Sequence, residues 1–107
     1  MKRMSFRHHF ADQIIDGKKN VTWRLYDDKD LQKGDELELI DAETGARFAK
    51  AVIVDMREKK LGEIDDVDYV GHETYMSNDD MIETYRGYYG PQVDKNTVAK
   101  IIQFKLI

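Results

Sequence analysis

The chain contains no cysteine, a single proline and no long apolar run. The missing thiols exclude disulfide bonds, thiol catalysis and thiolate metal sites, and they fit a reducing compartment. No apolar stretch approaches the roughly 18–20 residues of a membrane span. The basic residues near the N-terminus are not followed by the apolar segment of a signal peptide. We therefore expect a cytoplasmic protein with no membrane partner.

The protein is slightly acidic, because acidic residues outnumber basic ones and leave a net charge of −4 over 107 residues. This balance argues against broad binding to duplex DNA, which relies on many phosphate contacts. A locally basic cleft remains compatible with it, because clefts focus the electric field. The length predicts a single domain over residues 1–107, and an apolar content of 41% gives it a modest core.

The densest group of chemically useful side chains lies in the segment from Gly17 to Arg24, with the sequence Gly-Lys-Lys-Asn-Val-Thr-Trp-Arg. If residues 21–25 form a strand, successive side chains alternate between its two faces. Thr22 and Arg24 then share one face, whereas Trp23 points with its apolar neighbours toward the core and away from any cleft. The pattern therefore predicts a hydroxyl beside a fixed cation, and it predicts that Trp23→Ala mainly destabilises the protein.

The rest of the chain predicts short elements joined by connections of hairpin length. We expect strands at 4–6, 21–25, 36–40, 48–56 and 97–106, helices at 8–16 and after the N-cap Ser77, and one helical turn at 61–64. The second helix is expected to end at residues 87–91, and the acidic residues 65–68 are expected to form a solvated loop. The fold class is α+β or mainly β, a small β-barrel of five to six mostly antiparallel strands with two to three short flanking helices.

Several motifs occur in the order that is found in one known family. They are a short helix with Ile14-Ile15, the string Gly-Lys-Lys-x-x-Thr-x-Arg, the turn Lys33-Gly34-Asp35, Glu73 ahead of Ser77, Tyr85-Arg86 in a helix, and a closing strand that ends Ile-Ile-Gln-Phe-Lys-Leu. With these motifs the chain resembles the ASCH family, a branch of the PUA-like superfamily, over nearly its whole length. The resemblance implies a PUA-like barrel that binds RNA, a nucleoside or a nucleotide in a cleft lined by the Gly-Lys-Lys region.

A bacterial subgroup of similar domains hydrolyses the acetyl amide of N4-acetylcytidine with a Lys, a Thr and a Glu. The resemblance maps the Lys and the Thr onto Lys19 and Thr22. The Glu maps onto Glu73, and Thr74 is the alternative because the spacing that follows is one residue longer than usual. The chain departs from the subgroup at Asn20, where a Thr is common, which bears on the activity more than on the fold.

Two functions follow for the same cleft. In the first hypothesis, a binding protein, the cations Lys18, Lys19 and Arg24 contact phosphate or base oxygens of the ligand. Tyr26 contacts the ligand by stacking, as other tyrosines could, and Thr22 and Glu73 line the floor.

In the second hypothesis, an enzyme, Thr22 is the nucleophile of an amidohydrolase, Lys19 is its base and Glu73 assists. A lysine acts as a base only when neutral, which requires its pKa to fall by roughly 2–3 units from about 10.4.

Purely structural roles account for the same residues. The lysines of the turn suit solvent, Thr22 is a good strand former, and Arg24 could pair with Asp27, Asp28 or Glu73. The tyrosines at 85, 88 and 89 suit the wall of the barrel. A third alternative is accordingly a protein-interaction module without a nucleic-acid ligand.

No metal site and no cofactor are expected. His8 and His9 are adjacent and point apart on a helix, His72 is distant in sequence, and no His-x-x-x-His pair exists. The acidic residues at 65–68 and 79–80 lack the glycine and the terminal glutamate of a calcium loop.

Overall fold

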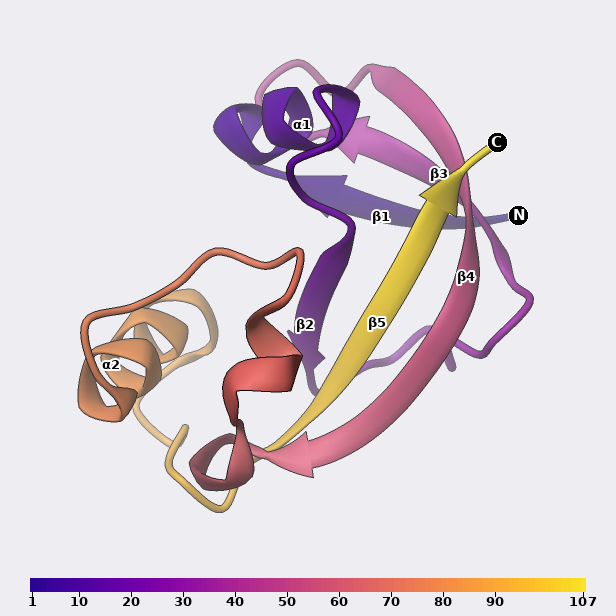
Figure 1. Ribbon diagram of the computed structural model, residues 1–107. Coiled ribbons are helices and arrows are strands. Elements are labelled where there is room, and N and C mark those ends of the chain that lie inside the picture. Colours follow the sequence, from indigo (N-terminus) through magenta and orange to yellow (C-terminus); the bar gives the residue numbers. More distant parts are fainter.

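The computed structural model describes residues 1–107 and contains a single sheet with two α-helices and two short 3-10 helices (Figure 1). The strands are β1 (Lys2–Phe6), β2 (Val21–Leu25), β3 (Glu36–Asp41), β4 (Arg47–Lys60) and β5 (Val98–Leu106). The helices are α1 (His8–Ile15), η1 (Leu61–Glu63), η2 (Asp66–Tyr69) and α2 (Asn78–Tyr89). Neither α-helix has the length and apolar character needed to cross a membrane.

The five strands follow the order β1-β3-β4-β5-β2. The β1–β3 pair is parallel, and the other three pairs are antiparallel. The sheet curls into a half-barrel, so that the edge strands β1 and β2 face each other across an open seam (Figure 1). This α+β architecture confirms the predicted fold class, and its five mostly antiparallel strands fall within the predicted five to six.

Both helices begin or end where the local sequence predicts. α1 is followed by Gly17, whose φ of +79° is a conformation that glycine adopts without steric cost. α2 is capped by Ser77, whose hydroxyl oxygen accepts a hydrogen bond from the backbone N–H of Asp80. α2 ends at Tyr89, within the expected residues 87–91, and Gly90 follows it with a φ of +120°.

The prediction of a solvated acidic loop at residues 65–68 is wrong for Asp68. β4 runs on to Lys60 beyond its expected end, because its charged C-terminal half still pairs with β5. This extension carries Arg57 and Lys59 to the fully buried Asp68 carboxylate, at 2.6 Å and 2.8 Å. The pKa of Asp68 falls to about 2, because these hydrogen bonds and the N–H of Asp65 outweigh the effect of burial.

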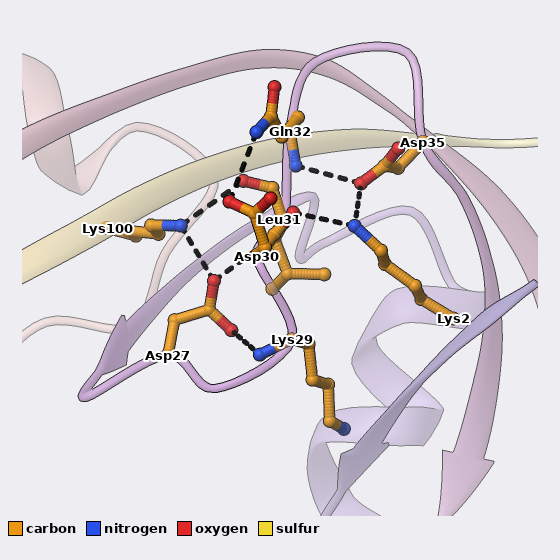
Figure 2. A network of polar contacts seen from close by, with 8 residues as sticks. All are labelled: Lys2, Asp27, Lys29, Asp30, Leu31, Gln32, Asp35 and Lys100. Carbon is orange, nitrogen blue, oxygen red and sulfur yellow. Dashed lines mark hydrogen bonds and ion pairs between the residues drawn. The ribbon is translucent and has the colours of Figure 1, made fainter.

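A polar network fixes the loop between β2 and β3 (Figure 2). The Asp27 carboxylate accepts hydrogen bonds from Lys100 Nζ of β5 at 2.7 Å and from the backbone N–H groups of Lys29 and Leu31. At the other end of the loop, Lys2 of β1 donates to Asp35 at 2.7 Å. The loop therefore ties the C-terminal end of β2 to β5 and to β1.

Two apolar clusters lie on either side of the seam. The first contains residues of β1, α1, β3, β4 and β5, with the fully buried Leu37 and Leu39 among its members. The second contains residues of β2, β5, η1 and α2, with Trp23 and Tyr85 among its members. The open seam is thus flanked by packed side chains from both clusters.

Candidate functional site

A cavity of about 370 Å³ opens between the edge strands β1 and β2. The two strands share no backbone ladder, and Arg24 of β2 spans the seam by donating a hydrogen bond from Nη2 to the Ser5 carbonyl at 2.9 Å. The cavity is lined by Ser5, Phe6, Arg7, Phe10, Lys19, Thr22, Trp23, Arg24, Ala42, Glu73, Tyr85, Gly87, Tyr88 and Tyr89. Four of the residues expected from the sequence, Lys19, Thr22, Arg24 and Glu73, therefore meet in one place.

The strand β2 presents its side chains much as the alternation predicts. Val21, Trp23 and Leu25 belong to the second apolar cluster, whereas Thr22 and Arg24 line the cavity. Trp23 is only 2% exposed, yet it also forms part of the cavity wall. The expectation that Trp23 lies wholly away from the cleft is therefore wrong, because its large ring extends from the core to the cavity.

Lys19 is the most buried cation of the cavity, with 3% of its surface exposed. The turn after α1 directs its side chain back over β2, where Nζ donates to the Val21 carbonyl at 2.8 Å and to Glu73 Oε2 at 2.7 Å. Burial lowers the pKa of Lys19, and the Glu73 carboxylate partly offsets this effect. Burial would raise the pKa of Glu73, but Lys19 and His72 outweigh it and hold that pKa below its usual value.

His72 connects Glu73 to the aromatic core. Its Nδ1 lies 2.7 Å from the Glu73 backbone carbonyl, so Nδ1 carries the proton and donates it. The ring stacks on Trp23 with centroids 3.9 Å apart and an interplanar angle of 10°. Burial and the nearby Lys19 lower the pKa of His72 to about 4, so the imidazole is neutral at physiological pH. Thr74, the alternative to Glu73, is exposed and lies outside the cavity.

Aromatic rings form the remaining walls. Tyr85, Tyr88 and Tyr89 reach the cavity from the last turns of α2, and Phe6 and Phe10 reach it from β1 and α1. Tyr85 is buried in the core, but 41% of Tyr88 is exposed at the cavity.

Arg24 does not make the structural ion pair considered from the sequence. Its only hydrogen bond goes to the Ser5 carbonyl, and its guanidinium lies 4.8 Å from the centre of the Phe6 ring. Burial lowers its pKa, although Tyr89 and Tyr85 offset part of this effect.

Two predicted ligand-contacting residues lie outside the cavity. Lys18 is exposed in the turn after α1. Tyr26 is 55% exposed, has a φ of +53° and lines a neighbouring surface hollow that it shares with Arg24. Both remain predicted contacts for a ligand that extends beyond the cavity.

Sequence reasoning missed the contribution of β1 and of His72. Arg7 and Phe6 reach the cavity because the sheet curls, and no local pattern reports which edge strands face each other. His72 was considered only as a metal ligand, although its position next to Glu73 was a usable signal. No group of three or more His, Asp or Glu side chains is placed to hold a metal ion.

No family model matches the chain, and no curated protein matches it either. Several solved structures, in contrast, match the chain. A hypothetical protein, PH0355, aligns with a TM-score of 0.76 at 23% identity over 100% of both chains. An ASCH domain from Lactobacillus crispatus JV V101 aligns with a TM-score of 0.73 at 14% identity, over 98% of this chain and 79% of the other. The chain has the ASCH fold.

A third solved structure, the ASCH protein from Zymomonas mobilis, agrees with this assignment. Its TM-score is 0.64 at 16% identity, over 96% of this chain and 65% of the other. The resemblance to the ASCH family seen in the sequence is thus matched at the level of the fold. The cavity between β1 and β2 is described from the residues of this chain alone.

Proposed function

We propose that this protein binds a nucleoside or nucleotide unit, free or as part of single-stranded RNA, in the cavity between β1 and β2. The observation that carries the proposal is the composition of that cavity. It combines aromatic faces with cations, a carboxylate and a hydroxyl in about 370 Å³. Pockets that hold small organic ligands have volumes of roughly 300–1,000 Å³ and a few convergent polar groups.

The size of the cavity favours one base over a longer stretch of nucleic acid. A base inserted between the walls would meet Phe6, Tyr88 and Tyr89, and base–aromatic stacking contributes roughly 1–3 kcal/mol per base. The Thr22 hydroxyl and the Glu73 carboxylate would supply hydrogen-bond partners for the polar edge of the base. The resemblance of the sequence to the ASCH family implies a ligand of this general class, RNA or a nucleotide, and the fold shared with ASCH structures agrees with that resemblance.

The test is a calorimetric titration of the purified protein with the four ribonucleosides, their monophosphates and a short single-stranded RNA. We expect Tyr88→Ala to weaken binding about 10- to 100-fold, the equivalent of one lost stacking contact. Met76→Ala is the control, because Met76 is 96% exposed and lies outside the cavity. Equal affinity of wild type and Tyr88→Ala, or no binding of any of these compounds, would refute the proposal.

A second candidate is an amidohydrolase acting on N4-acetylcytidine. It is favoured by the meeting of Lys19, Thr22 and Glu73, which are up to 54 positions apart in sequence, in one cavity. The Thr22 oxygen would attack the acetyl carbonyl, the C–N bond would break, and water would then release acetate from the acyl-threonine. Lys19 would take the hydroxyl proton and return it to the leaving amine, which requires it to be neutral at the moment of attack.

The geometry sets a condition on this second candidate. Lys19 Nζ is held by Glu73 and by the Val21 carbonyl, and the Thr22 hydroxyl makes no hydrogen bond within the protein. Catalysis would require the amine to turn from Glu73 to Thr22.

Release of acetate from N4-acetylcytidine separates the two candidates. The hydrolase requires turnover that Thr22→Ala and Lys19→Ala abolish while the protein stays folded. The binding protein shows no turnover, and Thr22→Ala weakens its affinity by no more than about tenfold, the loss of one hydrogen bond, without abolishing binding.

A further inference from the structure

Arg24 stands apart from the other cations of this protein. Among the lysines and arginines that are not fully exposed, six have a carboxylate partner within ion-pair distance: Lys2, Lys19, Arg57, Lys59, Arg86 and Lys100. Arg24 has none, although it is half-buried and its Nε atom is fully buried. Burying a charge is costly unless an opposite charge or several hydrogen bonds compensate it.

The local contacts of Arg24 leave most of its donors unused. Its guanidinium carries five N–H donors, and its hydrogen bond to the Ser5 carbonyl uses one. The Nε donor is buried and has no partner at all. The Phe6 ring, 4.8 Å from the guanidinium carbon, covers the flat face of the group but satisfies no N–H.

A second cation without a counter-ion lies at the same cavity. Arg7 follows β1, is exposed at the wall of the cavity that it lines, and packs its guanidinium 4.7 Å from the centre of the Tyr88 ring. It forms no ion pair either, whereas Lys19, the third cation of the cavity, is neutralised by Glu73. The cavity thus keeps two unpaired arginines in a protein whose net charge is −4.

We propose that Arg7 and Arg24 form an anion subsite that takes the phosphate of a nucleotide, so that the ligand of the cavity is phosphorylated rather than a neutral nucleoside. This inference rests on the proposed binding function and specifies its ligand class. The planar fork of an arginine suits the oxygens of a phosphate, which it contacts through paired N–H groups. A bound phosphate would act as the counter-ion that Arg24 lacks within the protein.

The subsite also places the rest of the ligand. A phosphate on the arginines lies at the β1–β2 seam, and the base then extends toward the tyrosines of α2 and the Lys19–Glu73 pair. Arg24 also borders the neighbouring hollow that contains Tyr26. A chain continuing from the phosphate would therefore leave the cavity over Arg24 and pass Tyr26.

The test compares each ribonucleoside with its 5′- and 3′-monophosphates by calorimetry. We expect at least one monophosphate to bind about tenfold or more tightly than its nucleoside, the gain expected from one charge-assisted hydrogen bond. Arg24→Gln should abolish this difference and Arg7→Gln should reduce it. The control Arg3→Gln removes the same charge from β1, outside the cavity, and should leave the difference intact.

A second measurement on the wild-type protein does not depend on the folding of any variant. Inorganic phosphate and acetate are titrated while the ¹H–¹⁵N resonance of the Arg24 Nε–H is followed by NMR. Phosphate should shift this resonance at lower concentration than acetate does. The Arg3 Nε–H resonance is the internal control.

The outcomes separate the subsite from the base site. Equal affinity for nucleosides and monophosphates overturns the subsite and leaves the proposed function standing. A phosphate-induced shift at Arg24 without binding of any nucleoside or nucleotide supports the subsite as a site for free phosphate and refutes the proposed function. No shift and no binding overturns both.

Discussion

At the scale of single residues, the cavity depends on a short series of contacts that begins in the core. Trp23 stacks on His72, His72 donates to the backbone carbonyl of Glu73, and Glu73 accepts from Lys19. Each contact fixes the orientation of the next side chain, so the carboxylate that faces the cavity is positioned in part by His72, which does not line the cavity. Two predictions concern single residues, His72 and Trp23.

The first concerns His72 and pH. The unfolded chain protonates His72 below about pH 6.5, but the folded protein does so only below about 4, because the ring is buried. The unfolded state therefore binds more protons between these values, and the fold loses up to about 3 kcal/mol as the pH falls from 6.5 to 4. His72→Asn should remove this slope from the free energy of unfolding, measured by urea denaturation at a series of pH values.

The control for this prediction has the opposite sign. Asp41 and Asp12 raise the pKa of His8, so His8 stabilises the fold at low pH and this contribution is lost as the pH rises through the folded pKa. His8→Asn should therefore abolish the gain in stability that the wild type shows as the pH falls toward about 6.5, and it should not remove the loss of stability at lower pH. If His72→Asn leaves the acid slope unchanged, His72 is not buried in its neutral form.

The second prediction concerns Trp23. The side chain is nearly inaccessible and contacts the rings of His72, Tyr69, Tyr75 and Tyr85. Trp23→Ala should lower the free energy of unfolding by about 3–5 kcal/mol, because it leaves a large cavity in the second apolar cluster. Chemical denaturation measures this change. A Trp23→Ala protein of wild-type stability with lost ligand affinity would show that the ring serves the cavity and not the core.

At the scale of elements, the loop between β2 and β3 positions the cavity indirectly. It is anchored by the Lys100–Asp27 pair, whose carboxylate is only 5% exposed (Figure 2). Lys100, which interrupts the apolar pattern of β5, is therefore explained by a partner in a distant loop. The anchor holds the end of β2 and with it the strand that carries Thr22 and Arg24.

The prediction at this scale is that Asp27→Ala lowers the free energy of unfolding by about 2–4 kcal/mol, because it leaves the Lys100 ammonium half-buried without its partner. Asp28→Ala, at the next position, is the matched control. Asp28 is exposed and makes no side-chain contact, so its removal should change stability by less than about 0.5 kcal/mol. Thermal and urea unfolding measure both. Equal effects of the two substitutions would exclude the anchor.

At the scale of the whole molecule, the charge distribution bears on the proposed nucleic-acid ligand. The net charge is negative, and the unpaired positive charge of the cavity comes from two arginines, Arg7 and Arg24. The molecule therefore suits a compact ligand or one exposed unit of a strand, and it is poorly suited to tracking a long polyanion.

The corresponding prediction is a weak dependence of RNA affinity on salt. Two phosphate contacts give a slope of about −1.4 in a plot of log binding constant against log salt concentration, at roughly 0.7 per contact for single strands. The measurement is the dissociation constant of a short single-stranded RNA between about 50 and 200 mM salt. A slope steeper than about −4 would show that a broad basic surface, not the cavity, binds RNA.

The features of this protein that depend on interactions between neighbouring residues were predictable from the sequence. The Ser77 cap, the Gly17 stop and the alternation along residues 21–25 each depend on neighbours within a few positions, and the structure confirms all three. The motif order likewise predicted a PUA-like fold. The error at Asp68 arose because two distant partners, Arg57 and Lys59, overrode the local pattern.

The sequence by itself determined which residue types this protein has for chemistry, because composition excludes thiols and the Gly-Lys-Lys-x-x-Thr-x-Arg string places a hydroxyl near cations. Only the tertiary structure decided which of them meet. The curling of the sheet brings β1 opposite β2, so Arg7 joins Arg24 at one cavity while Lys18 remains outside it. Pairing with Glu73 neutralises Lys19, and Arg24 is left without a carboxylate. These outcomes depend on contacts between residues far apart in the chain, which no local pattern encodes.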